Sequence, residues 1–257
     1  MRIATWNVNS VRARLPRLLA WLDDQEPDVV CLQETKCLDD VFPLSEIEDL
    51  GYHVETFGQR TYNGVAILSR TPMEECFRGF PDDEDDADRR VIGATIDGVQ
   101  ILNLYVVNGQ EVGSEKYEYK LAWLDRLHSM MAEYYDPSEM VVVTGDFNIT
   151  FDDRDVYNPE RWREKILCST PEREALGRLM DLGFHDALRR QQVEGGIYTW
   201  FDFRTRGFER GQGLRIDHFL MSESAALRCS DVYVDLDERG QEKPSDHAPV
   251  IATLDGV

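Results

Sequence analysis

The sequence predicts an α/β fold: a four-layer sandwich in which two mixed β-sheets pack face to face, with helices on the outside. Strand-sized apolar runs alternate with helical spacing along the whole chain. The two halves also run in parallel, because each opens with a strand and a helix and continues into several strands. With 257 residues, 42% of them hydrophobic, the chain can bury a large core. No linker divides it, so residues 1–257 are expected to form a single domain.

The first half of the chain opens with a strand at residues 3–8. Residues 11–24 then carry leucines at helical spacing, which predicts a helix with Ser10 as its N-cap. Further strands are expected at 28–33, 64–69, 91–96 and 100–107. The dipeptide Asp97-Gly98 between the last two strands is a hairpin turn signal.

The second half is expected to hold two helices and three strands. The helices span residues 116–135 and 170–182, and the strands span 140–143, 214–221 and 250–254. Ser169 or Thr170 caps the second helix, with Pro171 in its first turn. The run at 140–143 is continuously apolar, which is typical of a buried central strand.

Cysteine usage and hydropathy indicate the compartment. The five cysteines are odd in number and include no Cys-x-x-Cys pair, so neither disulfides nor a zinc site are expected. No apolar stretch is long enough to cross a membrane, and the start shows no signal peptide. We expect a cytoplasmic monomer with no membrane association.

The formal net charge of −21 is unusual for an enzyme of nucleic acids, because phosphates are normally met by Lys and Arg. Net charge governs long-range steering, however, and not local contacts. Part of the acid is concentrated in residues 81–88, which we interpret as a solvated loop. The composition therefore does not exclude a nucleic-acid substrate.

Four short polar clusters each lie where an apolar strand ends or begins. They are residues 6–9 (WNVN), 32–35 (LQET), 145–148 (GDFN) and 245–248 (SDHA). Carboxylates, amides and an imidazole at strand ends are the groups that a hard metal ion and a water-activating site require. Because the clusters are spread over almost the whole chain, the fold must gather them into one composite site.

Two of these clusters offer acids. Glu34 ends an apolar run, where a carboxylate is costly unless it is paired or metal-bound, although an isolated Glu can also be a cap or a surface acid. Gly145 lets the backbone turn, and Asp146 and Asn148 alternate, so that both can point to one side. Together they could hold and deprotonate a water molecule, or they could form an Asx-rich turn.

The last cluster offers a histidine at the rim of a sheet. His247 follows Asp246 and precedes a strand. A further acid, Asp217, could orient the imidazole and stabilise its charged form, which suits a phosphate that becomes more negative during attack. His218 is a rival to His247, but its place within an apolar run favours a packing role.

Aromatic side chains supply the remaining candidates. Tyr105 closes the strand at 100–107, and it is either an ordinary strand aromatic or a phenol that contacts a phosphate or the attacking water. Residues 199–204 (TWFDFR) place three aromatics and an arginine in an expected loop. Core packing accounts for one of these rings, whereas exposed aromatics beside an arginine suit stacking on nucleic acid.

Taken together, the clusters resemble the endonuclease/exonuclease/phosphatase superfamily and, more narrowly, its exonuclease III branch. The resemblance runs nearly end to end and also includes residues 62–68 (YNGVAIL), 213–217 (GLRID) and 243–250 (KPSDHAPV). It implies a DNase I-like fold and a DNA repair phosphodiesterase that depends on Mg²⁺, for which Mn²⁺ can substitute. The implied substrate is double-stranded DNA, cut 5′ of abasic sites or trimmed and cleaned at its 3′ ends in base excision repair.

The resemblance also implies a role for each candidate. Glu34 would be the main Mg²⁺ ligand, and the surroundings of the metal would include Asn7, Asp146, Asn148, Asp246 and His247. Asp146, held by Asn148, would activate the attacking water. His247, paired with Asp217, would bind the phosphate, and Tyr105 would contact the phosphate or the water. The implied substrate contacts are Arg89, Arg90, Asn108, Lys120, Trp200 and Phe201.

Two departures and two alternatives accompany this resemblance. Val106-Val107 stands where the family commonly has a proline, and Asn9 stands where some relatives carry Asp. One alternative is a phosphodiesterase or phosphatase of the superfamily that acts on small phosphoesters, against which the aromatic loop argues. The other is a non-catalytic RNA-binding regulator, which could lose Glu34 or Asp146 without penalty.

Overall fold

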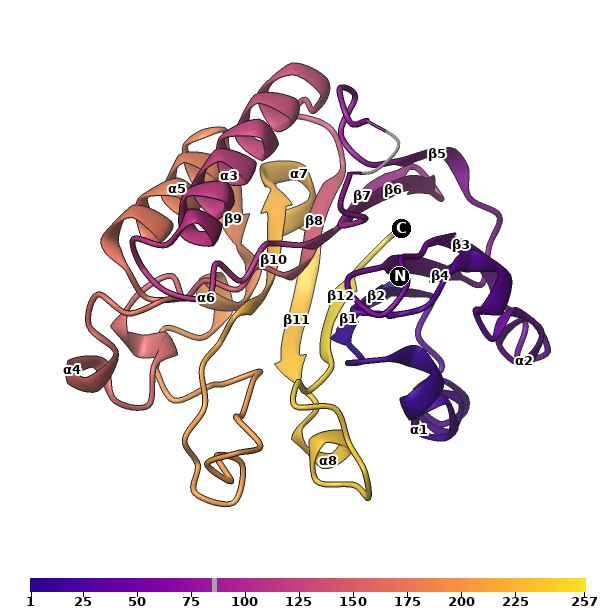
Figure 1. Cartoon of the computed structure of the whole chain (residues 1–257). Coiled ribbons are helices and arrows are strands. Elements are labelled where there is room, and N and C mark those ends of the chain that lie inside the picture. The colour runs from indigo at the N-terminus through magenta and orange to yellow at the C-terminus, as the bar shows by residue number, and fades with distance from the viewer. Residues whose placement is uncertain (85–86) are drawn as a thin grey trace.

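Two six-stranded mixed sheets pack face to face and carry helices on their outer faces, so the expected four-layer architecture is confirmed (Figure 1). This computed structural model describes residues 1–84 and 87–257. Within them, no helix is both long and apolar enough to cross a membrane.

The first sheet has the strand order β11-β12-β1-β2-β4-β3. Its strands are β1 (Arg2–Asn7), β2 (Val29–Gln33), β3 (His53–Phe57), β4 (Val65–Ser69), β11 (Cys229–Val234) and β12 (Val250–Leu254). The central strand β1 runs parallel to β2 and antiparallel to β12, which comes from the far end of the chain. The last strand of the sequence is therefore an interior strand of the first sheet.

The second sheet has the order β5-β6-β7-β8-β10-β9. Its strands are β5 (Glu74–Arg78), β6 (Val91–Ile96), β7 (Val99–Tyr105), β8 (Val141–Asp146), β9 (Phe184–Asp186) and β10 (Asp217–Ser222). β7 and β8 are parallel, and β8 and β10 are antiparallel. The carboxyl ends of β7 and β8 therefore meet the start of β10 at one edge.

Three apolar layers hold the sandwich together. The middle layer lies between the sheets and takes alternate residues from strands of both, because successive side chains of a strand point to opposite faces. Helix α1 (Val11–Gln25) covers the outer face of the first sheet. Helices α3 (Glu115–Tyr134) and α5 (Thr170–Asp181) pack together on the outer face of the second sheet.

Short helices and turns complete the chain. They are η1 (Asp39–Val41), α2 (Leu44–Glu48), η2 (Asp153–Asp155), α4 (Pro159–Trp162), α6 (Ala187–Gln191), α7 (Glu223–Ala226) and α8 (Leu236–Arg239). At the expected caps, Ser10 accepts from the Ala13 amide and Ser169 forms a capping box with Glu172.

A polar pair joins the two sheets inside the core. The Nδ2 of Asn103 on β7 donates to the carbonyls of Leu32 and Ala66 in the first sheet, at 3.0 and 2.9 Å. The Nε2 of Gln33 on β2 donates to Asn103 Oδ1 at 2.7 Å. Because Gln33 directly precedes Glu34, these buried hydrogen bonds fix the position of the Glu34 segment of the first sheet relative to β7 of the second sheet.

The structure differs from the expected elements in several places. β10 begins at Asp217 and not at residue 214, because Leu214 makes isolated bridges with Val156 and Trp200 instead. The strands β3, β5, β9 and β11 were not expected. β5 is exposed at every residue and shows no apolar alternation, so its pairing with β6 leaves little trace in the sequence.

The acidic block at 81–88 is largely a surface loop. Asp82 and Asp83 form ion pairs with Arg126 of α3, at 2.6 and 2.8 Å. Asp85 and Asp86 lie outside the described residues. The described part of the block is thus a surface segment, held by the contacts of Asp82 and Asp83 with Arg126 and by those of Asp88 with Asn63 and Arg90.

Candidate active site

The four polar clusters meet at one edge of the sandwich, where strand ends from both sheets converge. Asn7 ends β1 and Glu34 follows β2, while Asp146 ends β8. In the second sheet Asp146 lies opposite both Tyr105 of β7 and Asp217 of β10 in the strand register. The order of the strands thus gathers residues that are far apart in the chain.

Asn7 joins the two sheets across the site. Its Nδ2 donates to Glu34 Oε1 at 2.7 Å and to Asp146 Oδ2 at 2.8 Å. Both Asn7 and Asp146 are buried. Glu34 adopts a positive φ of 51°, a conformation that turns the chain sharply after β2 and presents its carboxylate to the centre.

His247 bridges two carboxylates. Its Nδ1 lies 2.9 Å from Asp217 Oδ2, and its Nε2 lies 3.7 Å from Asp146 Oδ2. Burial alone would lower the pKa of His247, but the charges of Asp217 and Asp146 outweigh burial and raise the pKa above its ordinary value. The imidazole is therefore a cation at neutral pH, held with one edge toward the site.

Asp146 is the most perturbed carboxyl group of the centre. Burial raises its pKa, and the nearby charges of Asp217 and Glu34 raise it further, against the opposing charge of His247. Such a carboxylate is a stronger base than an exposed Asp. Its Oδ1 accepts from the backbone N–H of Asn148 at 2.9 Å, so the carboxylate is fixed in direction.

Asn148 supports Asp146 through its backbone and not through its amide. Its Nδ2 donates to the Val106 carbonyl at 3.1 Å, and its Oδ1 accepts from Asn108 Nδ2 at 2.9 Å. The positive φ of 50° at Asn148 places its N–H toward Asp146. Val106 thus supplies a carbonyl contact in the segment where the family commonly has a proline.

Lys120 lies beneath this loop and not on the surface. Its side chain is 0% exposed, forms an ion pair with Glu172, and donates to the Asn148 carbonyl at 2.7 Å. Lys120, which was expected to meet the DNA backbone, thus has its ammonium group inside the protein in this structure. It holds the turn that carries Asn148.

The two expected arginine contacts are already engaged within the protein. Arg90 is 8% exposed, packs over the Tyr105 ring with Cζ 4.7 Å from its centroid, and pairs with Asp88. Arg89 donates to the Gly58 carbonyl at 2.6 Å and keeps a partly exposed side chain. Burial, together with the charges of Glu34 and Asp146, raises the pKa of Tyr105 well above its ordinary value, so the phenol stays a neutral donor.

The aromatic loop, residues 199–213, is attached directly to the segment that carries Asp246 and His247. Trp200 Nε1 donates to Asp246 Oδ2 at 3.1 Å, and the Phe201 amide donates to the Asp246 carbonyl at 2.9 Å. Trp200 is partly exposed, whereas Phe201 is 4% exposed and packs against Phe208. Of the two rings that were expected at the substrate, the structure thus leaves that of Trp200 accessible and packs that of Phe201 inside the loop.

Asn9 and Lys36 also belong to the site, although neither was expected to have a role there. Asn9 Nδ2 donates to Asp246 Oδ1 at 2.9 Å, and Lys36 Nζ lies 2.7 Å from Glu34 Oε2. Lys36 also donates to Asn9 Oδ1 at 2.6 Å. An Asp at position 9 could not donate to Asp246, so the amide links the first and last clusters.

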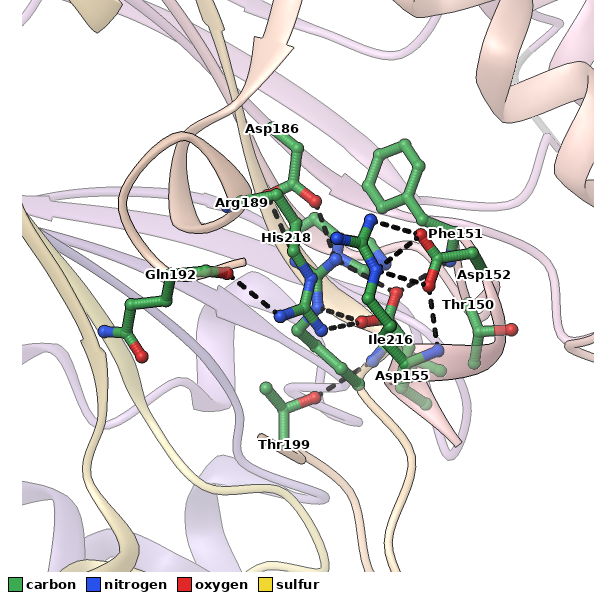
Figure 2. Close-up of polar contacts among 12 residues, drawn as sticks. Thr150, Phe151, Asp152, Asp155, Asp186, Arg189, Gln192, Thr199, Ile216 and His218 are labelled. Atoms are coloured by element: carbon green, nitrogen blue, oxygen red, sulfur yellow. Dashed lines mark hydrogen bonds and ion pairs between the residues drawn. The ribbon is translucent and has the colours of Figure 1, made fainter. Parts of the chain in front are cut away.

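A buried ionic cluster, formed by Arg215, Asp155, Asp186 and Arg189, supports the start of β10 next to Asp217 (Figure 2). Arg215 is 1% exposed and donates to Asp155 at 2.7 and 3.0 Å. It donates also to Asp186 at 3.1 and 2.6 Å. All four carboxylate oxygens of Asp155 and Asp186 thus accept hydrogen bonds from the guanidinium group of Arg215.

His218 has a packing role, as expected from its apolar surroundings. Its ring lies beside that of Phe151 (Figure 2), with 4.7 Å between the ring centroids. Its Nε2 lies 2.7 Å from the Ile149 carbonyl. Burial lowers its pKa to about 4, and the charge of Arg215 acts in the same direction. The imidazole is therefore neutral in the folded protein.

This shift predicts a pH dependence of stability. Between pH 6.5 and about 4 the unfolded chain binds a proton at His218 that the folded protein does not, so stability falls as the pH falls. From pH 7 to pH 5, wild type should lose about 2 kcal/mol more than His218→Gln in urea unfolding. Parallel losses in the two proteins would contradict the buried neutral imidazole.

The carboxylates of the centre fit a divalent cation. One ligand atom each from Glu34, Asp146 and His247 lie within 4.8 Å of one another. Oxygen ligands suit hard cations, and a cation among Glu34 and Asp146 would offset the repulsion that raises the pKa of Asp146. The charged His247 is held by Asp217, which leaves the two carboxylates as the better ligands.

Comparison with known proteins identifies the family. The model of the Endonuclease/Exonuclease/phosphatase family matches residues 4–247. Exodeoxyribonuclease III of Haemophilus influenzae is 38% identical over 264 aligned positions, which cover 98% of this chain and 99% of that protein. The chain belongs to the exodeoxyribonuclease III family. This is a family of DNA nucleases that hydrolyse phosphodiester bonds, so the expected class of enzyme is confirmed.

Two solved structures of the exodeoxyribonuclease III family share the whole fold. The 3′ phosphatase NExo from Neisseria, bound to a product DNA hairpin, is 46% identical with a TM-score of 0.96 and covers 99% of each chain. An AP endonuclease from Archaeoglobus fulgidus is 39% identical with a TM-score of 0.95, also over 99% of each chain. The family thus contains both end-processing and abasic-site enzymes on one scaffold.

Proposed function

We propose that this exodeoxyribonuclease III family member cuts duplex DNA 5′ of abasic sites and removes nucleotides or blocking groups from 3′ ends. One observation carries the proposal: Asp146, with a raised pKa, lies between the Asn7 amide and the His247 cation, beside Glu34. A base, a cation and a carboxylate ligand are the parts that hydrolysis of a phosphodiester requires.

The side chains divide the work as follows. Asp146 accepts the proton of the attacking water, and the backbone N–H of Asn148 sets the direction of the carboxylate. His247 faces the phosphate as a cation, and Asp217 fixes its ring and keeps it charged. The neutral phenol of Tyr105 donates a hydrogen bond to a phosphate oxygen or to the water.

Mg²⁺, or Mn²⁺ in its place, is the proposed cofactor. Glu34 is its main ligand, with Asp146 as the second carboxylate and with Asn7 and Asp246 nearby. The bound ion supplies Lewis-acid stabilisation of the negative charge that develops on the phosphate and the leaving 3′-oxygen. Asn7 now directs its NH₂ group to both carboxylates, so an amide oxygen at the ion requires the amide to rotate.

Substrate choice is assigned to the aromatic loop. Trp200 is partly exposed and bonded to Asp246, so its ring lies next to the centre of cleavage. A phosphodiesterase that acts on small phosphoesters does not need an exposed aromatic surface beside its centre. Because this chain has one, hydrolysis of small phosphoesters is only the second candidate function. The relatives named above include a 3′ phosphatase and an AP endonuclease, which supports both activities for this chain.

The deciding experiment compares two duplexes in the presence of Mg²⁺. One carries a single abasic site and the other is undamaged with a recessed 3′ end. We expect incision of the first and trimming of the second, both abolished by a chelator. Cleavage of neither duplex, together with hydrolysis of a small phosphoester, would replace the proposal by the second candidate.

Binding to DNA should depend weakly on salt. The net charge is −21, and two of the cations expected at phosphates, Lys120 and Arg90, are buried. Since each neutralised phosphate contributes about 0.9 to the slope, we expect log K to fall against log salt with a slope of about −2 to −4. A fluorescence-anisotropy titration in Mg²⁺ at several salt concentrations measures it, and a slope near about −8 would contradict the assignment.

We further propose that residues 1–257 act as one catalytic domain, as a monomer in the cytoplasm. All five cysteines are free thiols in the structure, which supports a reducing compartment. Light scattering with and without DNA tests the oligomeric state, and a dimer would contradict the proposal.

A further inference from the structure

Arg239, at the end of α8, lies inside a cage of aromatic rings. Its Cζ is 4.8 Å from the ring centroid of Phe208, 5.0 Å from that of Phe203 and 5.7 Å from that of Phe201. All three rings belong to the aromatic loop, and Arg239 does not. The residue itself is 6% exposed, so the loop is wrapped around a buried guanidinium group.

The pairing of Arg239 differs from that of the buried Arg215. Arg215 is bonded to two carboxylates, whereas no carboxylate of the described residues lies within 4.0 Å of Arg239. Its Nη2 donates to the Phe201 carbonyl at 3.4 Å, and its Nε has no partner among those residues. A buried cation without a counter-ion is costly, and an apolar side chain of similar size would avoid that cost.

The faces of the three aromatic rings offset part of the cost of burying the guanidinium group of Arg239. Each ring presents negative potential on its face, and a planar guanidinium group can approach several faces at once, which an ammonium group cannot. A cleft of about 340 Å³ lies beside the cage and is lined by Phe203, Arg206, Phe208, Arg239 and Pro244. Close packing alone therefore does not hold the rings, because there is space into which they can move.

The cage is connected to the site of cleavage. Phe201, whose carbonyl and ring both contact Arg239, donates its amide to the Asp246 carbonyl at 2.9 Å. Its neighbour Trp200 bonds to the Asp246 carboxylate and forms a β-bridge with His247. On the outer side, Phe203 is 44% exposed with Arg239 against its face.

We infer that Arg239 is a positioning residue that fixes the aromatic loop in the conformation that recognises the nucleotide at the cut, and so sets substrate discrimination. The inference rests on the proposed function for its DNA substrate. Arg239 makes no contact with Asp146 or Glu34 among the described contacts, so the chemical step itself should be largely unaffected by its loss.

The first test follows the loop without DNA. Arg204, Arg206 and Arg210 are exposed trypsin sites within it. Arg239→Met should speed trypsin cleavage after Arg204 and Arg210 about tenfold, because the cage then opens locally more often. Arg206→Met is the matched control: its side chain is 74% exposed, and the guanidinium group that lies over the three rings is that of Arg239. Cleavage after Arg204 and Arg210 should therefore stay at the wild-type rate in this variant. Unchanged cleavage in Arg239→Met would overturn the inference.

The second test measures discrimination. For the Arg239→Met variant we expect KM for the abasic duplex to rise about fivefold to tenfold with kcat within about twofold, since only binding geometry is lost. The ratio of kcat/KM for the abasic duplex to that for the undamaged 3′ end should fall accordingly. Arg239→Lys keeps the positive charge but lacks the planar guanidinium group. Its trypsin cleavage rate and its KM should lie between those of wild type and Arg239→Met. If Arg239→Met does not fold, Arg239→Lys still provides both measurements.

The outcomes separate the inference from the proposed function. A loosened loop with an unchanged discrimination ratio overturns the role in specificity. A fall in kcat without a change in KM overturns it as well, because it would place Arg239 in the chemical step. Failure of wild type to cut either duplex overturns the proposed function, while the proteolysis result still decides whether Arg239 holds the loop.

Discussion

Asp146→Asn should lower kcat by about 10³-fold while the affinity for DNA changes little. The amide has nearly the same shape as the carboxylate, and it can still accept the Asn148 N–H that Asp146 Oδ1 accepts now at 2.9 Å. What it loses is the capacity to take a proton from water. Single-turnover cleavage of the abasic duplex measures the first quantity, and anisotropy binding measures the second.

The reason for so large an effect lies in the surroundings of Asp146. Burial and the charges of Asp217 and Glu34 raise its pKa, so that it is tuned as a base. No other carboxylate can replace it, because Asp217 is engaged with His247 and Asp246 with Asn9 and Trp200. Asp125→Asn, on the exposed surface of α3, is the control and should retain wild-type turnover. Loss of DNA binding in Asp146→Asn would instead assign the carboxylate a structural role.

Arg215→Met should destabilise the protein by about 3–5 kcal/mol. The substitution leaves Asp155 without its main partner and Asp186 without any guanidinium contact, although both are buried. Arg189 still pairs with Asp155, so one charge of the cluster keeps a counter-ion. Such a loss is a large fraction of the stability of an ordinary domain.

Urea unfolding at pH 7 measures this loss. Arg154→Met is the matched control, because Arg154 pairs with Asp152 at 2.6 Å on the surface, where both side chains are more than 40% exposed. That exposed pair should contribute about 1 kcal/mol or less. Arg215→Lys keeps the charge but cannot hold both acids in the same way, and it should fall between the two. Equal losses for Arg215→Met and Arg154→Met would show that the buried cluster contributes no more than a surface pair.

The parts of the fold that could be predicted are those with a strong local signal. The run at 140–143 predicts a buried strand, and the structure has β8 there, extended to Asp146. The helix α3 was expected at 116–135 and spans Glu115–Tyr134. By contrast β5 is polar and exposed, and only its partner β6 makes it a strand. Pairing of this kind is a tertiary effect that no window of sequence contains.

The same distinction holds for the site. The clusters at strand ends indicate which groups meet, because the ends of neighbouring strands must lie at a common edge. The direction of each polar group depends on partners far along the chain. Lys120 was expected at the surface, but Glu172, 52 residues away, takes its ammonium group inside. Arg239 shows no local signal at all, since its three rings, Phe201, Phe203 and Phe208, precede it by 31 to 38 residues.

The interior place of β12 has a consequence for the order in which the protein is made. β1 is synthesised at the start, yet its antiparallel neighbour is β12, and Asp246 and His247 immediately precede that strand. A growing chain on the ribosome holds Glu34 and Asp146 long before it holds the imidazole that must face them. The proposed centre is therefore complete only after residue 247 has left the ribosome, and its assembly is one of the last events of synthesis.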